Sequence, residues 1–221
     1  MIRLGAGRPD RIAAVGAHCD DIAIGAGGTL LTMCLARPGV RVDALVLSGG
    51  GGEREREERA ALAACCPGAD LRLTVLKLPD GRLPAHWEEA KAAVQELRGR
   101  TEPELVLAPR TDDAHQDHRG LARLVTTAYR DHLVLGYEIV KWDGDLGRPV
   151  AYQPLSPETA ERKVRLLQEH YPSQRHRPWY DREVFLGLAR IRGVECHARY
   201  AEAFAVAKLT LDLGADPCAY C

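Results

Sequence analysis

The sequence predicts an α/β fold in which one mostly parallel β-sheet lies between two layers of helices. Short runs rich in Val, Leu and Ala alternate with longer segments whose apolar residues recur at helical spacing, and Gly, Pro or Asp stands at the joins. The chain has 221 residues and contains neither an internal repeat nor a long linker. It therefore fits one domain, which we expect to span residues 1–221.

Strands and helices are predicted to alternate along the chain. Each apolar run is short enough for a buried strand, and each helical segment is long enough to cross over the sheet. The predicted strands are 11–17, 40–47, 71–78, 104–108 and 132–139, and the predicted helices are 27–36, 53–65, 84–97, 118–130, 157–170 and 182–192. Residues 144–154 are predicted to be irregular, and the last apolar run, 203–213, is compatible with a strand or a helix.

Charge and hydropathy exclude several classes of protein. A formal net charge of −1 gives no overall field that would attract nucleic acid or an anionic membrane. No stretch reaches the roughly 18 consecutive apolar residues of a membrane-spanning helix. Residues 1–11 lack the pattern of a signal peptide. We therefore expect a cytoplasmic protein with no nucleic-acid partner and no membrane span.

The seven cysteines are an odd number, and we interpret them as small apolar residues of a reducing compartment. Cys218 and Cys221 form a C-x-x-C pair at the end of the sequence. Neither a second pair nor a nearby histidine completes a four-ligand metal site there. We therefore expect no disulfide framework and no structural metal site from the cysteines.

Two clusters of polar side chains follow the first and fourth predicted strands. His18, Asp20 and Asp21 come directly after the first strand, and His115 and His118 follow the fourth. Either cluster alone is typical of a solvated turn in which Asp caps a helix. However, parallel strands joined by right-handed crossovers place their carboxyl ends at one edge of the sheet, where ligands bind. We therefore expect both clusters at that edge.

Residues of these types are the ligands of a catalytic zinc ion. Zinc binds imidazole nitrogen and carboxylate oxygen, and a catalytic site uses three protein ligands and keeps a position for water. The ion lowers the pKa of that water and polarises a carbonyl oxygen. The sequence therefore predicts Zn²⁺ and hydrolysis by attack of a zinc-bound water, with too few bridging ligands for a two-metal phosphoesterase.

Both clusters resemble motifs of the PIG-L or LmbE-like zinc-dependent de-N-acetylases. The first family motif, His-Pro-Asp-Asp-Glu, stands at residues 18–22 as His-Cys-Asp-Asp-Ile, and the second, His-x-Asp-His, is intact at residues 115–118. Weaker likenesses occur at 48–50, 54–57, 78–81, 173–174 and 201–204. The resemblance implies a Rossmann-like three-layer sandwich and an enzyme that removes the acetyl group from an N-acetylglucosamine-type sugar or glycoconjugate.

The resemblance also implies a role for each polar residue of the two motifs. The implied zinc ligands are His18, Asp21 and His118. Asp20 would be the general base, because a carboxylate beside the metal but not bound to it keeps its ability to accept a proton. His115 would stabilise the oxyanion as an imidazolium and protonate the leaving amine. Asp117 would orient His115.

Arg54 and Asp80 are predicted to bind the substrate, because they follow the second and third predicted strands at the same edge. An arginine binds phosphate or sugar hydroxyls well, with Arg56 as the alternative to Arg54. Asp80 also belongs to a Pro-Asp-Gly sequence that is typical of an ordinary turn. Residues 173–180, which combine Arg, His, Trp and Tyr, either stack against a sugar or anchor a surface loop.

Two departures from the first motif bear on its chemistry. Cys19 stands in place of the family's Pro and raises a thiolate nucleophile as a rival to the metal mechanism. A side chain between two inward-facing residues should face away from them, which disfavours that rival. Ile22 stands in place of the family's Glu, so the support of the site or its substrate contacts should differ.

Alternative functions share parts of this pattern. An amidase that acts on a thiol or sugar conjugate has the same resemblance. A non-catalytic sugar- or nucleotide-binding Rossmann-like protein would instead carry G-x-G-x-x-G directly after the first strand and an acidic residue at the end of the second. Neither feature is present, since residues 18–21 occupy the loop and the second strand leads to Ser48. The sequence leaves the sugar, its aglycone and the oligomeric state open.

Overall fold

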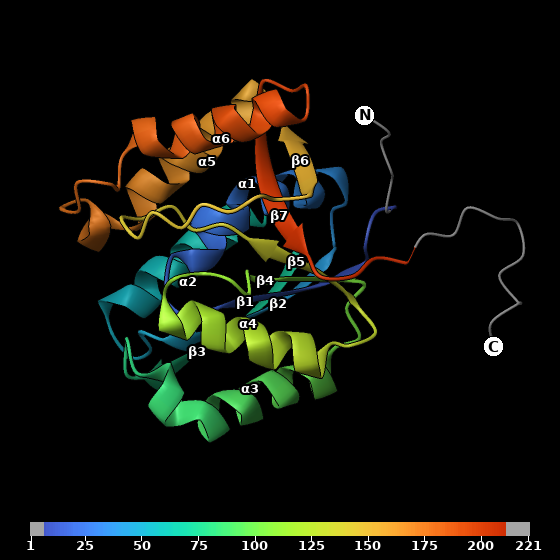
Figure 1. Ribbon diagram of the computed structural model, residues 1–221, viewed down its shortest axis with the longest axis vertical. Coiled ribbons are helices and arrows are strands. Elements are labelled where there is room, and N and C mark those ends of the chain that lie inside the picture. The colour runs from blue at the N-terminus through green and yellow to red at the C-terminus, as the bar shows by residue number, and fades with distance from the viewer. Residues whose placement is uncertain (1–6, 211–221) are drawn as a thin grey trace, which may run out of the picture.

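A seven-stranded sheet with helices on both faces forms the protein, whose computed structural model describes residues 7–210 (Figure 1). The strands follow the order β3-β2-β1-β4-β5-β7-β6. Strands β1 to β5 pair in parallel, while β7 runs antiparallel to β5 and β6. The strands are β1 (Arg11–Gly16), β2 (Arg41–Ser48), β3 (Asp70–Leu78), β4 (Leu105–Pro109), β5 (Leu133–Tyr137), β6 (Ala151–Leu155) and β7 (Tyr200–Val206). The predicted mostly parallel sheet is confirmed.

One layer of helices covers each face of the sheet (Figure 1). The first layer consists of α1 (Asp21–Ala36), α2 (Glu53–Cys65), α5 (Pro157–His170) and α6 (Arg182–Glu195). The second consists of α3 (Trp87–Arg100), preceded by a 3₁₀ turn at Leu83–His86, and α4 (Gln116–Ala128). Each layer buries a separate apolar cluster against the sheet, so the molecule is the predicted three-layer sandwich.

Local sequence sets the start of two helices in the first layer. The Ser156 hydroxyl accepts a hydrogen bond from the Thr159 N–H at 3.1 Å, and the Asp181 carboxylate accepts one from the Val184 N–H at 2.8 Å. These side chains satisfy backbone donors that the first helical turn leaves free. The predicted helix 157–170 coincides with α5, and the predicted helix 182–192 begins where α6 does. The predicted helix 53–65 coincides with α2, which begins after Gly52 without a side-chain cap.

Helix α1 begins six residues before the predicted helix 27–36, because tertiary packing overrides helix propensity there. A Cβ atom at Gly25 would lie 2.2 Å from the Tyr137 ring, and one at Gly28 would lie 2.6 Å from Leu155. The glycines therefore let α1 approach the sheet closely. Glu202 on β7 fixes this approach by accepting a hydrogen bond from the Gly28 N–H at 2.8 Å.

The prediction that residues 144–154 are irregular was wrong over its last part, where β6 pairs with β7. Pro154 made a strand seem unfavourable here, because proline has no backbone N–H to donate to a neighbouring strand. An edge strand tolerates proline because one side of it has no partner. The run 203–213, left open as strand or helix, overlaps β7, and its residues 211–213 lie outside the described residues.

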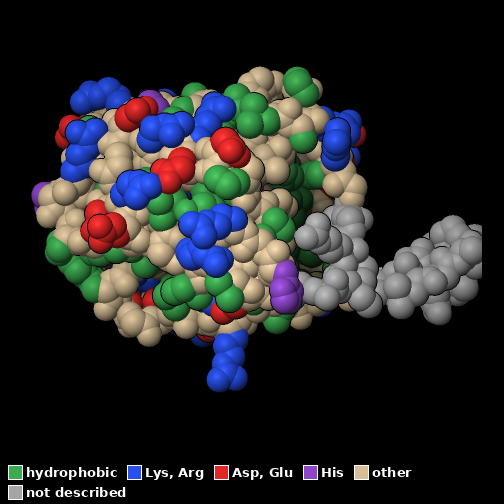
Figure 2. Space-filling model, turned by 90° about the horizontal axis from the view of Figure 1, so that it is seen from above, with side chains coloured by type: hydrophobic (Ala, Val, Ile, Leu, Met, Phe, Trp, Pro, Cys, Tyr) green, Lys and Arg blue, Asp and Glu red, His purple; other side chains and the backbone are tan. Residues whose placement is uncertain are grey.

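Within residues 7–210, the helices all fall short of the length and apolarity that crossing a membrane requires. The face above α5 and α6 carries basic and acidic side chains side by side (Figure 2). The cysteines of the described part of the chain are free and buried, which agrees with their interpretation as apolar residues. The Cys218 and Cys221 pair lies outside the described residues.

Candidate metal centre

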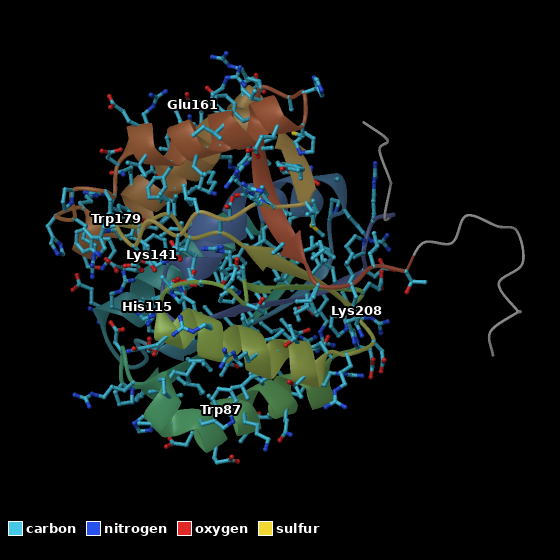
Figure 3. All side chains as sticks on the ribbon, in the orientation of Figure 1. Trp87, His115, Lys141, Glu161, Trp179 and Lys208 are labelled. Carbon is cyan, nitrogen blue, oxygen red and sulfur yellow. The ribbon has the colours of Figure 1, made fainter. Side chains whose placement is uncertain are left out.

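The two histidine motifs meet at the carboxyl ends of β1 and β4, which are neighbours in the sheet. The first motif opens α1 on one face of the sheet, and the second opens α4 on the other face. The chain leaves these two strands toward opposite faces of the sheet, which makes their carboxyl ends the position where sheets of this kind bind ligands. The expected meeting of the two clusters at this edge is confirmed. His115 marks the site in Figure 3.

Side chains of both motifs lie close together where a metal ion would bind. His18 Nδ1 and His118 Nε2 are 3.0 Å apart. Each Asp21 oxygen lies near one of these rings, with Oδ2 at 3.5 Å from His18 Nδ1 and Oδ1 at 3.3 Å from His118 Nε2. Ligand atoms roughly 2.0–2.1 Å from a tetrahedral zinc ion are about 3.3 Å from one another. The donor types and their spacing therefore fit zinc.

His115 belongs to the same group of side chains. It offers a ring nitrogen within 4.8 Å of ring nitrogens of His18 and His118, and a second group with ligand atoms at this spacing joins His18 to Asp80 and Asp117. His18 is common to both groups. The site is thus a cluster of imidazoles and carboxylates around His18.

The ring nitrogens of His18 and His118 that do not face each other, here called the outer nitrogens, lie beside carboxylates. His18 Nε2 lies 3.0 Å from Asp80 Oδ1 and 3.3 Å from Asp117 Oδ2. His118 Nδ1 lies 3.1 Å from Asp113 Oδ2. A carboxylate in this position favours a proton on the outer nitrogen and leaves the inner nitrogen free to bind a metal.

Electrostatics keeps Asp21 ionised. Burial raises the pKa of its carboxyl, but His118 and His18 outweigh burial, so the pKa lies well below its ordinary value. The backbone N–H groups of Ala17 and His18 each donate to Asp21 Oδ2 at 2.9 Å. Burial lowers the pKa of His118, but Asp21 and Asp113 outweigh it and raise that pKa to about 9. A metal ion would therefore compete with a proton for His118.

Asp20 lies between the two motif residues that supply donor atoms, with its backbone in the left-handed region at φ 110°. Its Oδ2 accepts a hydrogen bond from Arg54 Nη2 at 2.9 Å. Burial raises the pKa of the Asp20 carboxyl to about 6, although Arg54 opposes the shift. A carboxyl that titrates near neutrality is well suited to accept and release a proton.

His115 caps α4 and has a defined tautomer. Its Nδ1 accepts a hydrogen bond from the Asp117 N–H at 3.2 Å, so in the neutral ring the proton lies on Nε2. Burial, followed by the neighbouring His118, lowers the pKa of His115. The lowered pKa favours the neutral ring with its proton on Nε2, whereas the resemblance implies an imidazolium, and that role stays a prediction.

The Asp117 side chain faces His18 and a neighbouring loop. Its carboxylate accepts hydrogen bonds from the Gly81 N–H at 2.8 Å and the Leu83 N–H at 3.1 Å, besides its contact with His18. The hydrogen bond to His115 comes from the backbone of Asp117. Asp117 thus orients His115 through its main chain, while its side chain holds the loop after β3.

Arg54 turns into the site, whereas Arg56 is exposed. Besides Asp20, the Arg54 guanidinium donates to Glu57 Oε2 at 2.8 Å, to Ser173 Oγ at 3.0 Å and to the Cys19 carbonyl. Ser173 also donates to Glu57, which fastens the segment 173–180 to α2 beside the site. Of the two predicted arginines, the structure brings Arg54 to the site.

Asp80 is the most accessible of the predicted site residues, with a side chain that is 78% exposed. It extends from the loop after β3 to His18, and the hydrogen bond with His18 lowers the pKa of the Asp80 carboxyl. Its exposure leaves Asp80 accessible to a molecule that approaches His18.

Cys19 faces away from the donor atoms. It is 1% exposed and its thiol donates to the Ser48 carbonyl at 3.4 Å. Burial, together with Glu58, raises the pKa of the thiol, which disfavours a thiolate. Ile22 is fully buried in the apolar cluster beneath α1. The geometry therefore gives no support to a cysteine nucleophile.

Three residues of the site were missed in the sequence. Asp113 Oδ1 accepts a hydrogen bond from the His115 N–H at 2.7 Å and lies 3.1 Å from Lys141 Nζ (Lys141 is labelled in Figure 3). Glu58 Oε2 accepts one from the Asp20 N–H at 2.8 Å. The position of Asp113, two residues before His115, was a usable signal. Glu58 is hidden in a run of charged residues, and nothing near Lys141 indicates a site.

The aromatic part of segment 173–180 forms a small cluster. Trp179 packs edge-on against Tyr180 with ring centroids 5.6 Å apart and against Trp142 at 6.3 Å. Trp142 is 66% exposed. Trp179 lies on the same side of the molecule as Lys141 and His115 (Figure 3). Both earlier interpretations, a sugar-stacking surface and a loop anchor, are compatible with this cluster.

Solved structures with the same fold include enzymes of different chemistry. N,N'-diacetylchitobiose deacetylase from Pyrococcus horikoshii is 20% identical, with a TM-score of 0.70, over 90% of this chain and 84% of that one. The zinc-inhibited form of teicoplanin deacetylase Orf2 is 19% identical, with a TM-score of 0.66, over 90% and 100%. GalB, the 4-carboxy-2-hydroxymuconate hydratase from Pseudomonas putida KT2440, is 17% identical, with a TM-score of 0.69, over 92% and 99%. At these identities, the likeness establishes the fold.

A match to a family model shows the family of this chain, which the fold alone does not show. The model described as PIG-L, GlcNAc-PI de-N-acetylase, matches residues 13–129, which is more than half of the chain and includes both histidine motifs. The chain therefore belongs to the PIG-L family of de-N-acetylases.

Proposed function

We propose that this protein is a zinc-dependent hydrolase that removes the acetyl group from an N-acetylglucosamine-type sugar or glycoconjugate. The observation that supports this best is the contact of 3.0 Å between His18 Nδ1 and His118 Nε2, with one oxygen of the Asp21 carboxylate within 3.5 Å of each ring nitrogen and the Asp20 carboxyl beside them. Membership of the PIG-L family gives the reaction type. The fold by itself does not give the reaction type, because GalB has the same fold and is a hydratase.

His18 Nδ1, an Asp21 oxygen and His118 Nε2 would hold the zinc ion. When bound, zinc supplies a water molecule of lowered pKa and polarises the amide carbonyl. The outer carboxylates, Asp117 and Asp80 for His18 and Asp113 for His118, keep the rings oriented toward the ion.

Asp20 would act as the general base. Its carboxyl is buried, is hydrogen-bonded to Arg54 and has a pKa of about 6, so near neutral pH it is largely ionised and able to take the proton of an attacking water. The same proton can then pass to the leaving amine. Arg54 holds one carboxyl oxygen and thereby fixes which oxygen faces the substrate.

His115 would stabilise the oxygen of the tetrahedral intermediate. Its Nδ1 is occupied by the Asp117 N–H, so the Nε2–H is the group available for a developing negative charge. A donor that is already fixed by the start of α4 costs little reorganisation during the reaction. Asp117 contributes here through its backbone and, through its side chain, holds His18.

Arg54 and Asp80 would bind the substrate. Asp80 is exposed beside His18 and suits a sugar hydroxyl. Arg54 is about a quarter exposed and already has four protein partners, so a substrate oxygen would share its remaining donors. N-acetylated saccharides are the first substrates to test, because the similar structures include deacetylases named for diacetylchitobiose and teicoplanin.

Acetate release from a defined panel tests the proposal. The panel contains N-acetylglucosamine, N,N'-diacetylchitobiose, UDP-N-acetylglucosamine, N-acetylglucosaminyl phosphatidylinositol and an S-conjugated thiol amide, each with and without a chelator. We expect turnover of an N-acetyl sugar that the chelator abolishes and added zinc restores. Preferred cleavage of the thiol amide would favour the amidase alternative, and release that is unaffected by the chelator would contradict the proposal.

Two variants separate the metal from the base. Asp20→Asn should retain zinc and lose turnover by about 10²- to 10⁴-fold, because general base catalysis contributes that much. His118→Ala should lose both zinc and turnover, since it removes one of three ligands. Arg56→Ala is the control, because Arg56 is exposed and lies outside the site. Full activity in the Asp20 variant would rule out the assigned base.

A further inference from the structure

Glu58 is a buried carboxyl that the proposed reaction does not use. It lies on α2, is fully buried, and approaches the site from behind Asp20. Its Oε2 accepts hydrogen bonds from the Asp20 N–H at 2.8 Å and from the Tyr171 hydroxyl at 2.6 Å. Its Oε1 has no hydrogen-bond partner within the described residues. Burying a carboxyl with one oxygen unsatisfied is costly, so its position calls for a reason.

The contact with Asp20 supplies that reason. Within residues 7–210, Asp20 and His197 are the non-glycine residues with positive φ, and Asp20 stands at φ 110° and ψ −25°. Such a conformation is strained for a residue with a Cβ atom, and it persists only where the surroundings hold it. Asp20 caps α1 without a side-chain capping bond, so its side chain remains free for the site.

Two contacts hold the Asp20 backbone and side chain from opposite directions. Glu58 takes the N–H of Asp20, while Arg54 takes the Cys19 carbonyl and Asp20 Oδ2. The peptide bond between Cys19 and Asp20 is therefore held through its N–H by Glu58 and through its carbonyl by Arg54. Burial raises the pKa of the Glu58 carboxyl to about 8, so near neutral pH the group is largely protonated and uncharged. It therefore adds no negative charge that would repel the Asp20 carboxylate.

We propose that Glu58 is the positioning residue of the general base: it holds Asp20 in its left-handed conformation and so sets where the Asp20 carboxyl lies relative to the metal ligands. This inference rests on the proposed function, which makes Asp20 the general base. The role of Glu58 rests on its hydrogen bond from the Asp20 N–H. A displacement of about 1 Å at a reacting group can cost about a hundredfold in rate, so a backbone anchor of this kind is an effective control of catalysis.

Two substitutions of similar size separate the hydrogen bond from packing. Glu58→Met keeps the length of the side chain and removes the acceptor for the Asp20 N–H. Glu58→Gln keeps an acceptor and resembles the neutral acid. With the panel sugar that the wild type hydrolyses fastest, we expect Glu58→Met to lower kcat about 10- to 100-fold, with KM and bound zinc within about twofold of the wild type. Glu58→Gln should restore most of kcat.

Tyr171→Phe is the matched control. It removes the other hydrogen bond to the same Glu58 oxygen and leaves the one from Asp20, so kcat should stay within about threefold. If Tyr171→Phe reduces kcat as strongly as Glu58→Met, the contact with Asp20 has no special role and the inference is overturned.

A double-mutant cycle tests whether Glu58 acts through Asp20. In the Asp20→Asn background, adding Glu58→Met should cause little further loss of the residual turnover, because the base is already absent. An equal loss in both backgrounds would contradict the inference. If Asp20→Asn alone is fully active, the assignment of the base fails, which is a separate result.

Amide hydrogen exchange at Asp20 gives a readout that does not depend on activity. In the full-length, zinc-loaded protein, the Asp20 N–H should exchange faster in Glu58→Met than in the wild type, and Glu58→Gln should retain protection. Unchanged protection in Glu58→Met would overturn the inference whatever the enzyme hydrolyses.

Discussion

Asp113 lies two residues before the second histidine motif and contacts both of its histidines. Its carboxylate joins His118 Nδ1, the His115 N–H and Lys141. Burial raises the pKa of Asp113, but His118 and Lys141 outweigh burial and bring it to about 2, so the group stays charged. A fixed negative charge behind His118 strengthens that ring as a ligand. We therefore expect Asp113 to raise the affinity of the site for a metal ion that it does not itself bind.

We predict that Asp113→Asn lowers zinc affinity about 10- to 100-fold, because the charge behind His118 is lost while the shape is kept. Competition with a chromophoric chelator measures this. The control is Asp112→Asn at the adjacent position, whose side chain is 70% exposed and pairs with Arg110. Equal zinc affinity in the two variants would show that Asp113 does not support His118.

At the residue scale, the sequence predicted the motif residues well and their partners poorly. His18, Asp20 and His118 were recognisable because their types and spacing suit a metal site. Asp117 was recognised too, but its side chain contacts His18, since the loop after β3 offers it two backbone N–H groups. Glu58 lies in a run of alternating charges on α2, where nothing local distinguishes a buried carboxyl from solvated ones.

At the level of elements, α1 carries the first motif, and its position depends on glycines. Gly25 faces the Tyr137 ring, whose hydroxyl donates to the Val15 carbonyl at 2.6 Å at the end of β1. Tyr137 is fully buried and cannot move aside without disturbing β1 and β5. The low helix propensity of glycine is therefore the cost of seating α1 against the sheet directly after the motif.

Gly25→Ala should destabilise the protein by about 3 kcal/mol, because the added methyl would lie 2.2 Å from the Tyr137 ring. Gly187→Ala in α6 is the control, since no heavy atom lies within 4 Å of the added methyl. It should stabilise the protein by about 0.5–1 kcal/mol through helix propensity. Urea unfolding of both variants measures the difference, and a loss of stability in both would refute the packing argument.

The pattern of apolar residues along the sequence predicted some strands of the sheet and missed another. Strands β1, β2 and β4 are buried on both faces and read as nearly continuous apolar runs, which made them predictable. Strands β3 and β5 are only partly buried, but their Val and Leu residues still indicated strands. Strand β6 was missed because it is a five-residue edge strand that contains Pro154. Its pairing with β7 is a tertiary property, which a local pattern does not carry.

For the whole molecule, buried ionisable groups make stability depend on pH. Burial raises the pKa of Glu58 to about 8, while Asp20, Asp21 and Tyr171 face it. From pH about 4.5, where the carboxyl titrates in the unfolded chain, to about 8, the unfolded chain releases a proton that the folded chain keeps. The contribution of Glu58 is therefore complete below this window and is lost as the pH rises through it.

We predict that Glu58→Gln reduces the loss of stability between pH 5 and pH 8. One proton accounts for at most about 1.4 kcal/mol per pH unit, so the difference is measurable. Urea unfolding of chelator-treated wild type and variant at the two pH values tests it. If both proteins lose the same stability over this range, Glu58 is ionised in the folded protein.

The meeting of β1 and β4 has a consequence for biosynthesis. His18 and His118 are separated by 100 positions in the chain, yet their ring nitrogens lie 3.0 Å apart. A growing polypeptide on the ribosome exposes the first two donors long before the third has been made. If this chain binds a metal ion as proposed, the ion would bind only after β1 and β4 have paired at the centre of the sheet, so metal binding would report that this part of the new protein has folded.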